Sequence, residues 1–277
     1  MKLILVPTDF SDNANNAIEY AASLADLQKA KLKIINVYTP AVTQYEIVSP
    51  IINEETERAK KVAEEQLQSI CKVITSEFKN LTCTSEFISG GIVEAIDNLV
   101  DQEKVDLVVM GSRGATGLER ILFGSNTAKV LETVKCPVLA VPDDCPFRTP
   151  KRIVYATDFN KKEIDRIGQL MEVAKAFQAE VLMVHITTDK EATLSEELLK
   201  KNFADKIAAV ANYDKISYHM KYEDNVLRGL ETFTQLVEVD MVASLTHKRS
   251  LFEKFYDPSI TKKMAYHNRL PLLALKA

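Results

Sequence analysis

The sequence predicts an α/β protein of two tandem, doubly wound domains, each built on a parallel sheet of five strands. Three observations lead to this prediction. The chain has 277 residues, which fits two domains of ordinary size better than one. Apolar, strand-like runs alternate with helical segments along the whole chain. Finally, the first half of the sequence recurs in the second half, which indicates two copies of one fold.

The internal repeat is clearest at the start and the end of each half. It makes Asp9 and Asp158 equivalent, and the two later matches share one offset, so the sequence between them aligns without a gap. The matches are LILVPTDFS (3–11) with RIVYATDFN (152–160), VDLVVMGS (105–112) with VDMVASLT (239–246), and CPVLAV (136–141) with LPLLAL (270–275). We therefore predict domains at residues 1–145 and 150–277, with the boundary near Asp143 to Lys151, where prolines and charges interrupt the pattern.

The first half opens with an apolar strand, and Ser11 or Asp12 can cap the helix that follows it. After the second strand comes a loop with Pro40 and Pro50, and then a long charged helix. From there, strands that are apolar on both faces alternate with helices, as in a sheet covered on both sides. The predicted elements are strand 3–9, helix 17–28, strand 31–39, helix 54–77, strand 82–89, helix 93–102, strand 105–110, helix 126–134 and strand 137–141. The second half repeats this order with a shorter middle.

Composition excludes several classes of protein. Lys and Arg number 35 against 39 Asp and Glu, so the net charge of −4 gives no overall case for binding nucleic acid or an anionic membrane. The opening apolar run is too short for a signal peptide or a membrane span, so we expect a cytoplasmic protein without membrane insertion. The four cysteines show no CxxC pair and no neighbouring histidine; we expect reduced, mostly buried thiols and no metal site.

Candidate binding residues follow from the predicted sheet. In an open parallel sheet, ligands bind beyond the carboxyl ends of the strands. Pro7 and Asp9 close the first strand, Val37 closes the second, and Met110 begins a glycine-bearing segment after the fourth. These strand ends are therefore where we expect a ligand.

The richest of these segments has glycine at Gly111, Gly114 and Gly124, followed by Ser125. Without side chains, Gly111 and Gly114 can adopt positive φ and bring the main chain close to a ligand. Gly124 and Ser125 then open a helix, whose first N–H groups lack internal partners and form a seat for phosphate. Ser125 equally suits a helix N-cap on structural grounds alone. The segment is neither the Walker sequence nor the dinucleotide fingerprint.

The series Gly-x2-Gly-x9-Gly-Ser, the Asp in VPTDFS and the ending CPVLAVP together resemble the universal stress protein family, over essentially the whole chain as a tandem pair. The resemblance implies a Rossmann-like, adenine nucleotide alpha hydrolase-like fold that binds ATP, or AMP or ADP, with any Mg²⁺ held mainly by the phosphates. It also implies that the last strands of the two halves pair, which gives an internal pseudo-dimer.

Carried over residue by residue, the resemblance implies that Asp9 contacts adenosine and that the main chain of Val37 meets the adenine edge. As an alternative, Asp9 can be retained as a helix cap. The other implied contacts are Gly111 and Gly114 to ribose and phosphates, Gly124 and Ser125 with the adjoining Asn126 to phosphates, Pro7 and Met110 as apolar lining, and Arg113 or Arg120 to phosphate charge unless these arginines are only solvated.

The second half departs from the motif. Gly111, Gly114 and Gly124 correspond to Leu245, Lys248 and Pro258, and only Ser125 keeps its identity, as Ser259. A side chain at Leu245 and a missing N–H at Pro258 oppose phosphate binding, so we predict one nucleotide site per chain, in the first half. The segment from Leu245 to Ser259 carries aromatics at positions 252, 255 and 256, which could plug a degenerate pocket, form a lid or docking surface, or bind another small molecule such as a lipid.

We therefore expect a nucleotide-dependent binding or signalling module of a stress response, with a protein partner whose identity the sequence does not give. The alternatives are a slow ATPase, or a scaffold whose C-terminal half binds a different small molecule such as a lipid. The first half has no histidine, and Glu119 is the single acid between Gly111 and Ser125, so no catalytic residue is assigned. Further association into a homodimer stays open.

Overall fold

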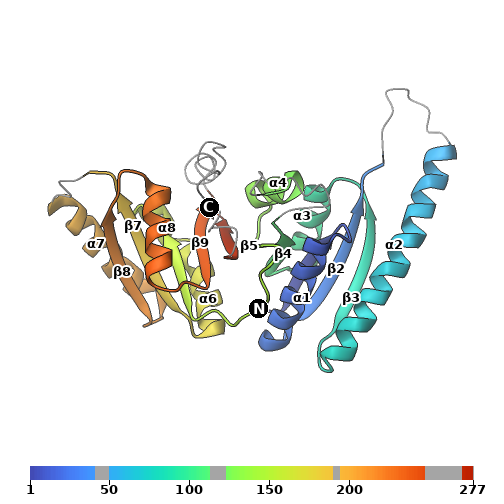
Figure 1. The fold of residues 1–277 in the computed structure, drawn as a ribbon, viewed down its shortest axis with the longest axis horizontal. Helices are drawn as coiled ribbons and strands as arrows, with labels where there is room; N and C mark the ends of the chain where they lie inside the picture. The colour runs from blue at the N-terminus through green and yellow to red at the C-terminus, as the bar shows by residue number, and fades with distance from the viewer. Residues whose placement is uncertain (41–49, 113–122, 190–193, 247–269, 277) are drawn as a thin grey trace. The chain divides into compact units, whose positions relative to one another are not determined.

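The computed structural model describes residues 1–40, 50–112, 123–189, 194–246 and 270–276 (Figure 1). They divide into two compact units, an N-terminal unit that ends at Phe147 and a C-terminal unit that begins at Arg148. Each unit is an α/β layer structure around a parallel sheet, which confirms the predicted fold class. No helix in the described part of the chain is both long enough and apolar enough to span a membrane.

The N-terminal unit has five parallel strands in the order β3-β2-β1-β4-β5. Its elements are β1 (Leu3–Thr8), α1 (Asp12–Gln28), β2 (Lys31–Tyr38), α2 (Pro50–Glu77), β3 (Cys83–Ser89), α3 (Ile92–Glu103), β4 (Leu107–Gly111), α4 (Ser125–Thr133) and β5 (Val138–Val141). The order reverses between β1 and β4: the chain steps outward from β1 to β3 and then crosses back to β4 on the other side of β1. Ligands of doubly wound sheets bind at such a reversal.

Local sequence explains how these elements begin and end. Ser11 is the N-cap of α1, and its hydroxyl oxygen accepts the N–H of Ala14 at 3.3 Å, as predicted for this residue. Lys29 ends α1 in the left-handed conformation, with φ 51°. All of Leu107–Gly111 is buried, as is Val138–Val141, which accounts for the continuous apolar runs in the sequence.

The C-terminal unit repeats the topology with the order β10-β9-β6-β7-β8. Its elements are β6 (Arg152–Ala156), α5 (Lys161–Ile164), α6 (Ile167–Phe177), β7 (Glu180–Thr187), α7 (Leu194–Ala211), β8 (Ile216–Tyr222), α8 (Val226–Leu236), β9 (Met241–Thr246) and β10 (Leu272–Lys276). Gly111 pairs with Val141 in one unit, and the equivalent Leu245 pairs with Leu275 in the other, so the repeat holds at the level of strand register.

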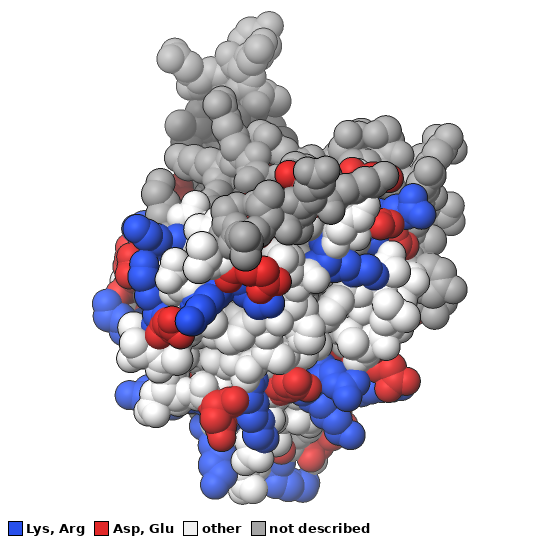
Figure 2. Space-filling view, turned by 90° about the vertical axis from the view of Figure 1, so that its left-hand side faces the viewer, with Lys and Arg blue, Asp and Glu red and all other residues white. Residues whose placement is uncertain are grey.

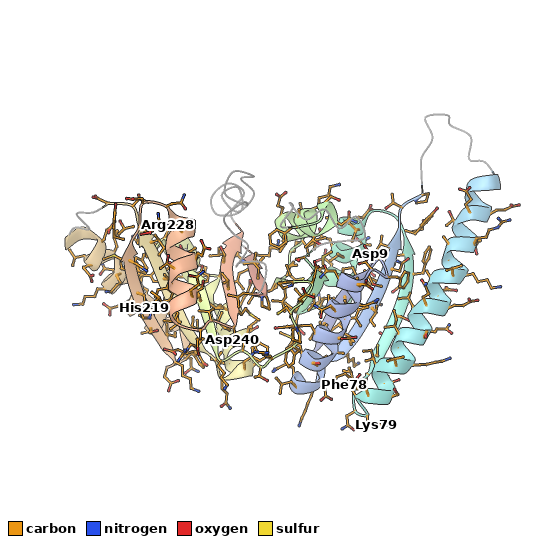
Figure 3. All side chains as sticks on the ribbon, viewed as in Figure 1. Asp9, Phe78, Lys79, His219, Arg228 and Asp240 are labelled. Atoms are coloured by element: carbon orange, nitrogen blue, oxygen red, sulfur yellow. The ribbon has the colours of Figure 1, made fainter. Side chains whose placement is uncertain are left out.

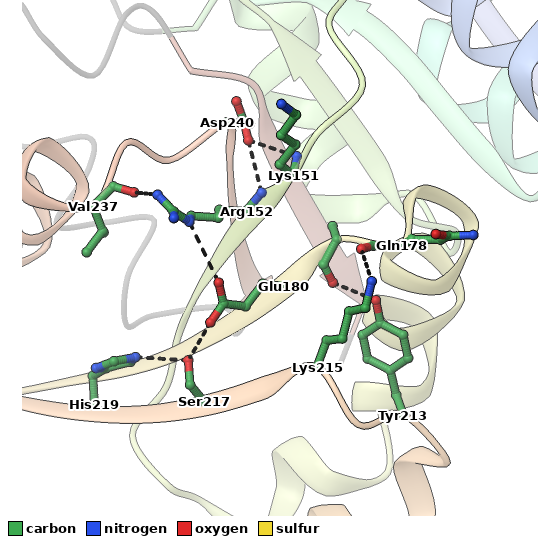
Figure 4. A network of polar contacts seen from close by, with 11 residues as sticks. Lys151, Arg152, Gln178, Glu180, Tyr213, Lys215, Ser217, His219, Val237 and Asp240 are labelled. Carbon is green, nitrogen blue, oxygen red and sulfur yellow. Dashed lines mark hydrogen bonds and ion pairs between the residues drawn. The ribbon is translucent and has the colours of Figure 1, made fainter.

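The amino ends of the strands are held by a second repeated feature. Asp240 accepts the backbone N–H groups of Lys151 and Arg152, at 2.8 and 2.9 Å (Figure 4). Asp106 accepts those of Lys2 and Leu3 in the same way. Figure 4 also shows the polar contacts that continue from Arg152 through Glu180 to Ser217 and His219, on β7 and β8. This network lies toward the amino ends of the strands in the C-terminal unit and ties those strands together.

Charges of both signs are scattered over the face of the C-terminal unit that Figure 2 presents. Lys and Arg side chains lie among Asp and Glu there, around a central area of uncharged residues. This pattern accords with the small net charge of −4.

Candidate functional site

The carboxyl ends of β1 and β4 meet at the reversal of strand order in the N-terminal unit. Ile4 pairs with Leu107 and Leu5 with Val108, so the two strands run side by side toward Asp9 and Gly111. Figure 3 places Asp9 at this end of the unit. The predicted residues after β1, β2 and β4 therefore gather at one edge of the sheet.

Asp9 organises the turn between β1 and α1. Its Oδ1 accepts the N–H of Ser11 at 3.1 Å and the Ser11 hydroxyl at 2.6 Å. Because Ser11 is the N-cap, the alternative that Asp9 itself caps the helix is wrong. Phe10, between them, has φ 64° and donates its N–H to Thr8 Oγ1 at 3.0 Å. A bulky residue with positive φ is uncommon, and such strained turns cluster at binding sites.

Val37 lies where β2 extends past the end of β1. Lys31 donates its N–H to Lys2 on the β1 side, whereas Leu32 donates to Thr82 on the β3 side, at 2.8 and 2.9 Å. Backbone groups of successive strand residues face alternate sides, so Val37 presents its N–H and carbonyl to the β1 side. The pairing of β1 with β2 ends at Thr8, one residue short of this level. The geometry thus offers Val37 main chain beside the Asp9 turn.

Gly111 has a packing role that the sequence did not reveal. A Cβ placed on it would lie 2.7 Å from Cγ and 3.0 Å from the carbonyl oxygen of Asn13, and the Asn13 side chain is buried. The prediction that Gly111 adopts positive φ is wrong, because it is the last residue of strand β4; among the described glycines that property belongs to Gly90. The absent side chain makes room for the first turn of α1.

The two ends of the glycine segment are joined by hydrogen bonds. Gly124 donates its N–H to the carbonyl of Ser112 at 2.8 Å, and the Thr127 hydroxyl donates to the carbonyl of Gly111 at 2.8 Å. These bonds bring the start of α4 against the end of β4. Residues 113–122, which include the predicted Arg113, Gly114 and Arg120, lie outside the described residues.

The N-cap of α4 is a glycine, which offers no side-chain acceptor of its own to the first N–H groups of the helix. Gly124 is the N-cap, without a side-chain hydrogen bond, and Ser125 is the first residue of the helix. The alternative that Ser125 is the N-cap is therefore wrong. Ser125 and the next residue, Asn126, are both exposed. The first N–H groups of a helix have no internal partners and attract anions, so this helix start fits the predicted phosphate seat.

Pro7 and Met110 are both buried within strands, Pro7 in β1 and Met110 in β4. Their role as apolar lining stays a prediction. Within the described ranges, no three His, Cys, Asp or Glu side chains lie close enough together to hold a metal ion.

The equivalent place in the C-terminal unit is built differently. Leu245 replaces Gly111 and is 4% exposed. The first helix, continuous in α1, is here interrupted between α5 and α6. The two changes fit each other, because a first turn packed as closely as that of α1 would collide with a leucine side chain. The other predicted departures, Lys248, Pro258 and Ser259, and the aromatics at 252, 255 and 256, lie outside the described residues.

Aromatic side chains occupy the turn after β6. Phe159 has φ 54° and donates its N–H to Thr157 Oγ1 at 2.9 Å, which repeats the Phe10 turn. Its ring is buried and packs against His185 and Phe203, with centroid distances of 5.0 and 5.4 Å. His185 Nδ1 donates to the carbonyl of Thr157 at 2.8 Å, and Asn36 makes the same bond to Thr8 at 2.9 Å in the other unit.

Glu163 is the buried carboxylate of this turn. It accepts the Thr157 hydroxyl at 2.7 Å and the N–H groups of Asp158 and Asn160 at 3.1 and 3.4 Å. Placed three residues after Asn160, it resembles the glutamate of a capping box. Burial raises its pKa above the ordinary value of 4.5, and the hydrogen bonds it accepts offset only part of this rise.

The raised pKa of Glu163 predicts a pH dependence of stability. The folded state binds the Glu163 proton more tightly than the unfolded state does. The stabilisation that this proton gives the folded state is therefore fully present below pH 4.5 and is lost as the pH rises through the folded pKa of Glu163. We expect wild type to lose stability relative to Glu163→Gln over that range. Urea unfolding at several pH values, with hydrogen exchange of β6 and α6 as the probe, measures it. A stability difference that does not change with pH would contradict the assignment.

The sequence profile of the universal stress protein family matches residues 1–142 of this chain. The chain belongs to this family. A universal stress protein of Methanocaldococcus jannaschii is 32% identical over 151 residues, which are 50% of this chain and 81% of that protein.

Two solved structures of the family extend the comparison. The crystal structure of a universal stress protein from Archaeoglobus fulgidus covers 99% of this chain and 98% of its own, with 19% identity and a TM-score of 0.68, and so has the same two-unit fold. A universal stress protein solved in complex with cAMP is 26% identical over 50% of this chain and 96% of its own, with a TM-score of 0.37.

Sequence reasoning predicted site roles for Asp9, Val37, Gly124 and Ser125, and it did not single out two buried residues that pack beside them. Thr127 joins the start of α4 to the end of β4 through its bond to Gly111, and Asn13 packs against Gly111 and donates to the Val141 carbonyl of β5; both residues are buried. The indication of these roles in the sequence is weak, because polar residues near a helix start are usually helix caps or solvent-exposed.

Proposed function

We propose that the N-terminal unit binds one adenine nucleotide per chain, as ATP, ADP or AMP, and that this universal stress protein is a nucleotide-dependent binding module of the cytoplasm. The observation that carries the proposal is the convergence of the Asp9 turn, the Val37 main chain and the start of α4, whose N-cap is a glycine, at the point where strand order reverses. In a bound nucleotide, the ribose would meet the Asp9 turn, the base would meet the Val37 main chain, and the phosphates would meet the start of α4.

In the proposed complex the exposed Asp9 carboxylate accepts hydrogen bonds from the ribose, and the Val37 main chain reads the adenine edge. Ser125, Asn126 and the backbone at Gly124 receive the phosphates, with Gly114 and Arg113 completing the segment. The donor set fits a polyphosphate, since helix N–H groups and a hydroxyl all donate to anionic oxygen. Any Mg²⁺ would be held mainly by the phosphates and water.

The C-terminal unit has no such seat in this proposal, because Leu245 fills the position of Gly111. No catalytic step is assigned to either unit. A protein partner that distinguishes the nucleotide-bound form, an internal pseudo-dimer of the two units and any further homodimer belong to the proposal as well.

Isothermal titration calorimetry of the full chain with ATP tests the proposal. We expect one adenine-nucleotide site per chain, with GTP binding more weakly because the Val37 edge is matched to adenine. Mass spectrometry of nucleotide released from freshly purified protein gives an independent readout. Two equal sites would contradict the assignment to the N-terminal unit, and no binding by either method would contradict the function.

A further inference from the structure

Two cysteines of the N-terminal unit are in direct contact. Cys71 lies in α2 and Cys83 begins β3, the strand against which α2 packs. The two Sγ atoms are 3.1 Å apart, and the Cys83 thiol donates a hydrogen bond to Cys71. Both are free thiols and both are partly exposed. The prediction that the cysteines are mostly buried is wrong, because of the four, Cys136 alone is buried.

The contact makes the two thiols chemically unequal. The hydrogen bond from Cys83 lowers the pKa of Cys71 to about 7, against the effect of burial and with further help from a hydrogen bond that Ser85 donates. The same bond, together with burial, raises the pKa of Cys83. At neutral pH a large share of Cys71 is therefore thiolate, which is the nucleophilic form, while Cys83 keeps its proton.

We propose that Cys71 and Cys83 form a peroxide-reactive dithiol, in which Cys71 is the attacking thiol and Cys83 the resolving thiol. The Cys71 thiolate attacks one oxygen of a hydroperoxide, ROOH. The O–O bond breaks, Cys71 becomes a sulfenic acid and RO⁻ leaves and takes a proton as ROH. Cys83 sulfur then attacks Cys71 sulfur, the S–O bond breaks and water leaves with the Cys83 proton, so that two sulfur atoms are oxidised for one peroxide reduced.

The fold favours the second step. A disulfide has an S–S bond of about 2.05 Å, so the sulfur atoms have to approach by only about 1 Å from their position in the reduced protein. The bond would join α2 to β3 across the turn in which Leu81 donates its N–H to the Phe78 carbonyl at 3.1 Å. A dithiol reductant reverses the reaction by thiol–disulfide exchange.

The proposed dithiol is separate from the nucleotide site. Figure 3 shows Phe78 and Lys79, which follow the end of α2, at the end of the N-terminal unit opposite Asp9. Cys83 is the first residue of its strand, whereas the proposed nucleotide contacts follow the last residues of theirs. Failure of one proposal therefore does not imply failure of the other.

The experiment treats the reduced full chain with one equivalent of hydrogen peroxide near pH 7.5 and then alkylates the remaining thiols. We expect two of the four thiols to be lost and recovered with dithiothreitol, and peptide mapping to find Cys71 linked to Cys83. The reaction rate should rise with a midpoint near pH 7, following the Cys71 thiolate. All four thiols alkylating as before would overturn the proposal.

Variants separate the two roles. In Cys83→Ser, Cys71 should stop at the sulfenic acid, which dimedone traps, and in Cys71→Ser the reaction should slow several-fold, because the attacking thiolate is removed. The paired change of Cys136 and Cys145 to Ser is the matched control and should react as wild type does. A reaction rate that is unchanged in Cys71→Ser would show that the folded contact does not drive the chemistry. So would a Cys71–Cys83 disulfide that still forms in preference to other pairs in urea.

Discussion

Gly111→Ala should lower the free energy of unfolding of the N-terminal unit by about 2–4 kcal/mol, because the new methyl group overpacks a buried site and displaces a buried amide. The Cβ would meet Asn13, whose side chain donates to the Val141 carbonyl at 3.4 Å and is 8% exposed. Moving Asn13 breaks that bond. Urea unfolding of the full chain, with hydrogen exchange of α1 and β4 as the local probe, measures the loss.

The same substitution should also abolish measurable nucleotide binding. The Gly111 carbonyl accepts the Thr127 hydroxyl, and the next residue, Ser112, accepts the Gly124 N–H. A shift of the end of β4 is thus transmitted to the start of α4, where we place the phosphates. Calorimetric titration with ATP provides this readout.

Two further changes control the Gly111 experiment. Gly168→Ala, in α6, has no neighbour within 4 Å of the new Cβ and should be neutral or stabilise by up to about 1 kcal/mol. Asn13→Ala should relieve the clash with the Asn13 side chain, though not the close approach to its backbone carbonyl, so that the double variant with Gly111→Ala shows a coupling of about 1–3 kcal/mol. If Gly111→Ala were as stable as wild type and lost only nucleotide affinity, the glycine would serve the ligand and the packing explanation would be wrong.

The sequence predicted the fold because its signals are local and repeated. Alternating apolar and helical segments identified the order of elements, and the second copy of the TDF motif tied Asp158 to Asp9. The two halves are also equivalent in hydrogen bonds that were not predicted: Asn36 donates to the carbonyl of Thr8, and His185 donates to the carbonyl of Thr157. An amide and an imidazole thus make the same hydrogen bond, which a comparison of residue types alone would not show.

The site was predicted less completely, because its decisive contacts join residues far apart in the sequence. From the sequence, Gly111 was predicted to belong to a ligand-binding loop, but in the structure it packs against Asn13 in the first turn of α1. Likewise, Cys71 and Cys83 lack the CxxC spacing, and only the packing of α2 on β3 brings their sulfur atoms together. Spacing along the chain gives no information on such pairs until the fold is known.

The repeat also supplies a matched pair for the nucleotide proposal: Asp9→Ala should weaken ATP binding roughly 10- to 100-fold, whereas Asp158→Ala should leave it unchanged. A hydrogen bond to a charged group contributes about 1.5–3 kcal/mol, and each 1.4 kcal/mol is a tenfold change in affinity. Asp158 follows β6 as Asp9 follows β1, but its unit has Leu245 where Gly111 stands. Calorimetry on both variants measures the difference.

Asp9→Asn separates recognition from folding in this experiment. The amide oxygen can still accept the Ser11 N–H and hydroxyl, which hold the turn at 3.1 and 2.6 Å, but the negative charge is lost. We expect this variant to be as stable as wild type and to bind ATP with an affinity between those of wild type and Asp9→Ala. Equal losses in the Asp9 and Asp158 alanine variants would mean that both units hold nucleotide, since the geometry around Leu245 would then not prevent binding.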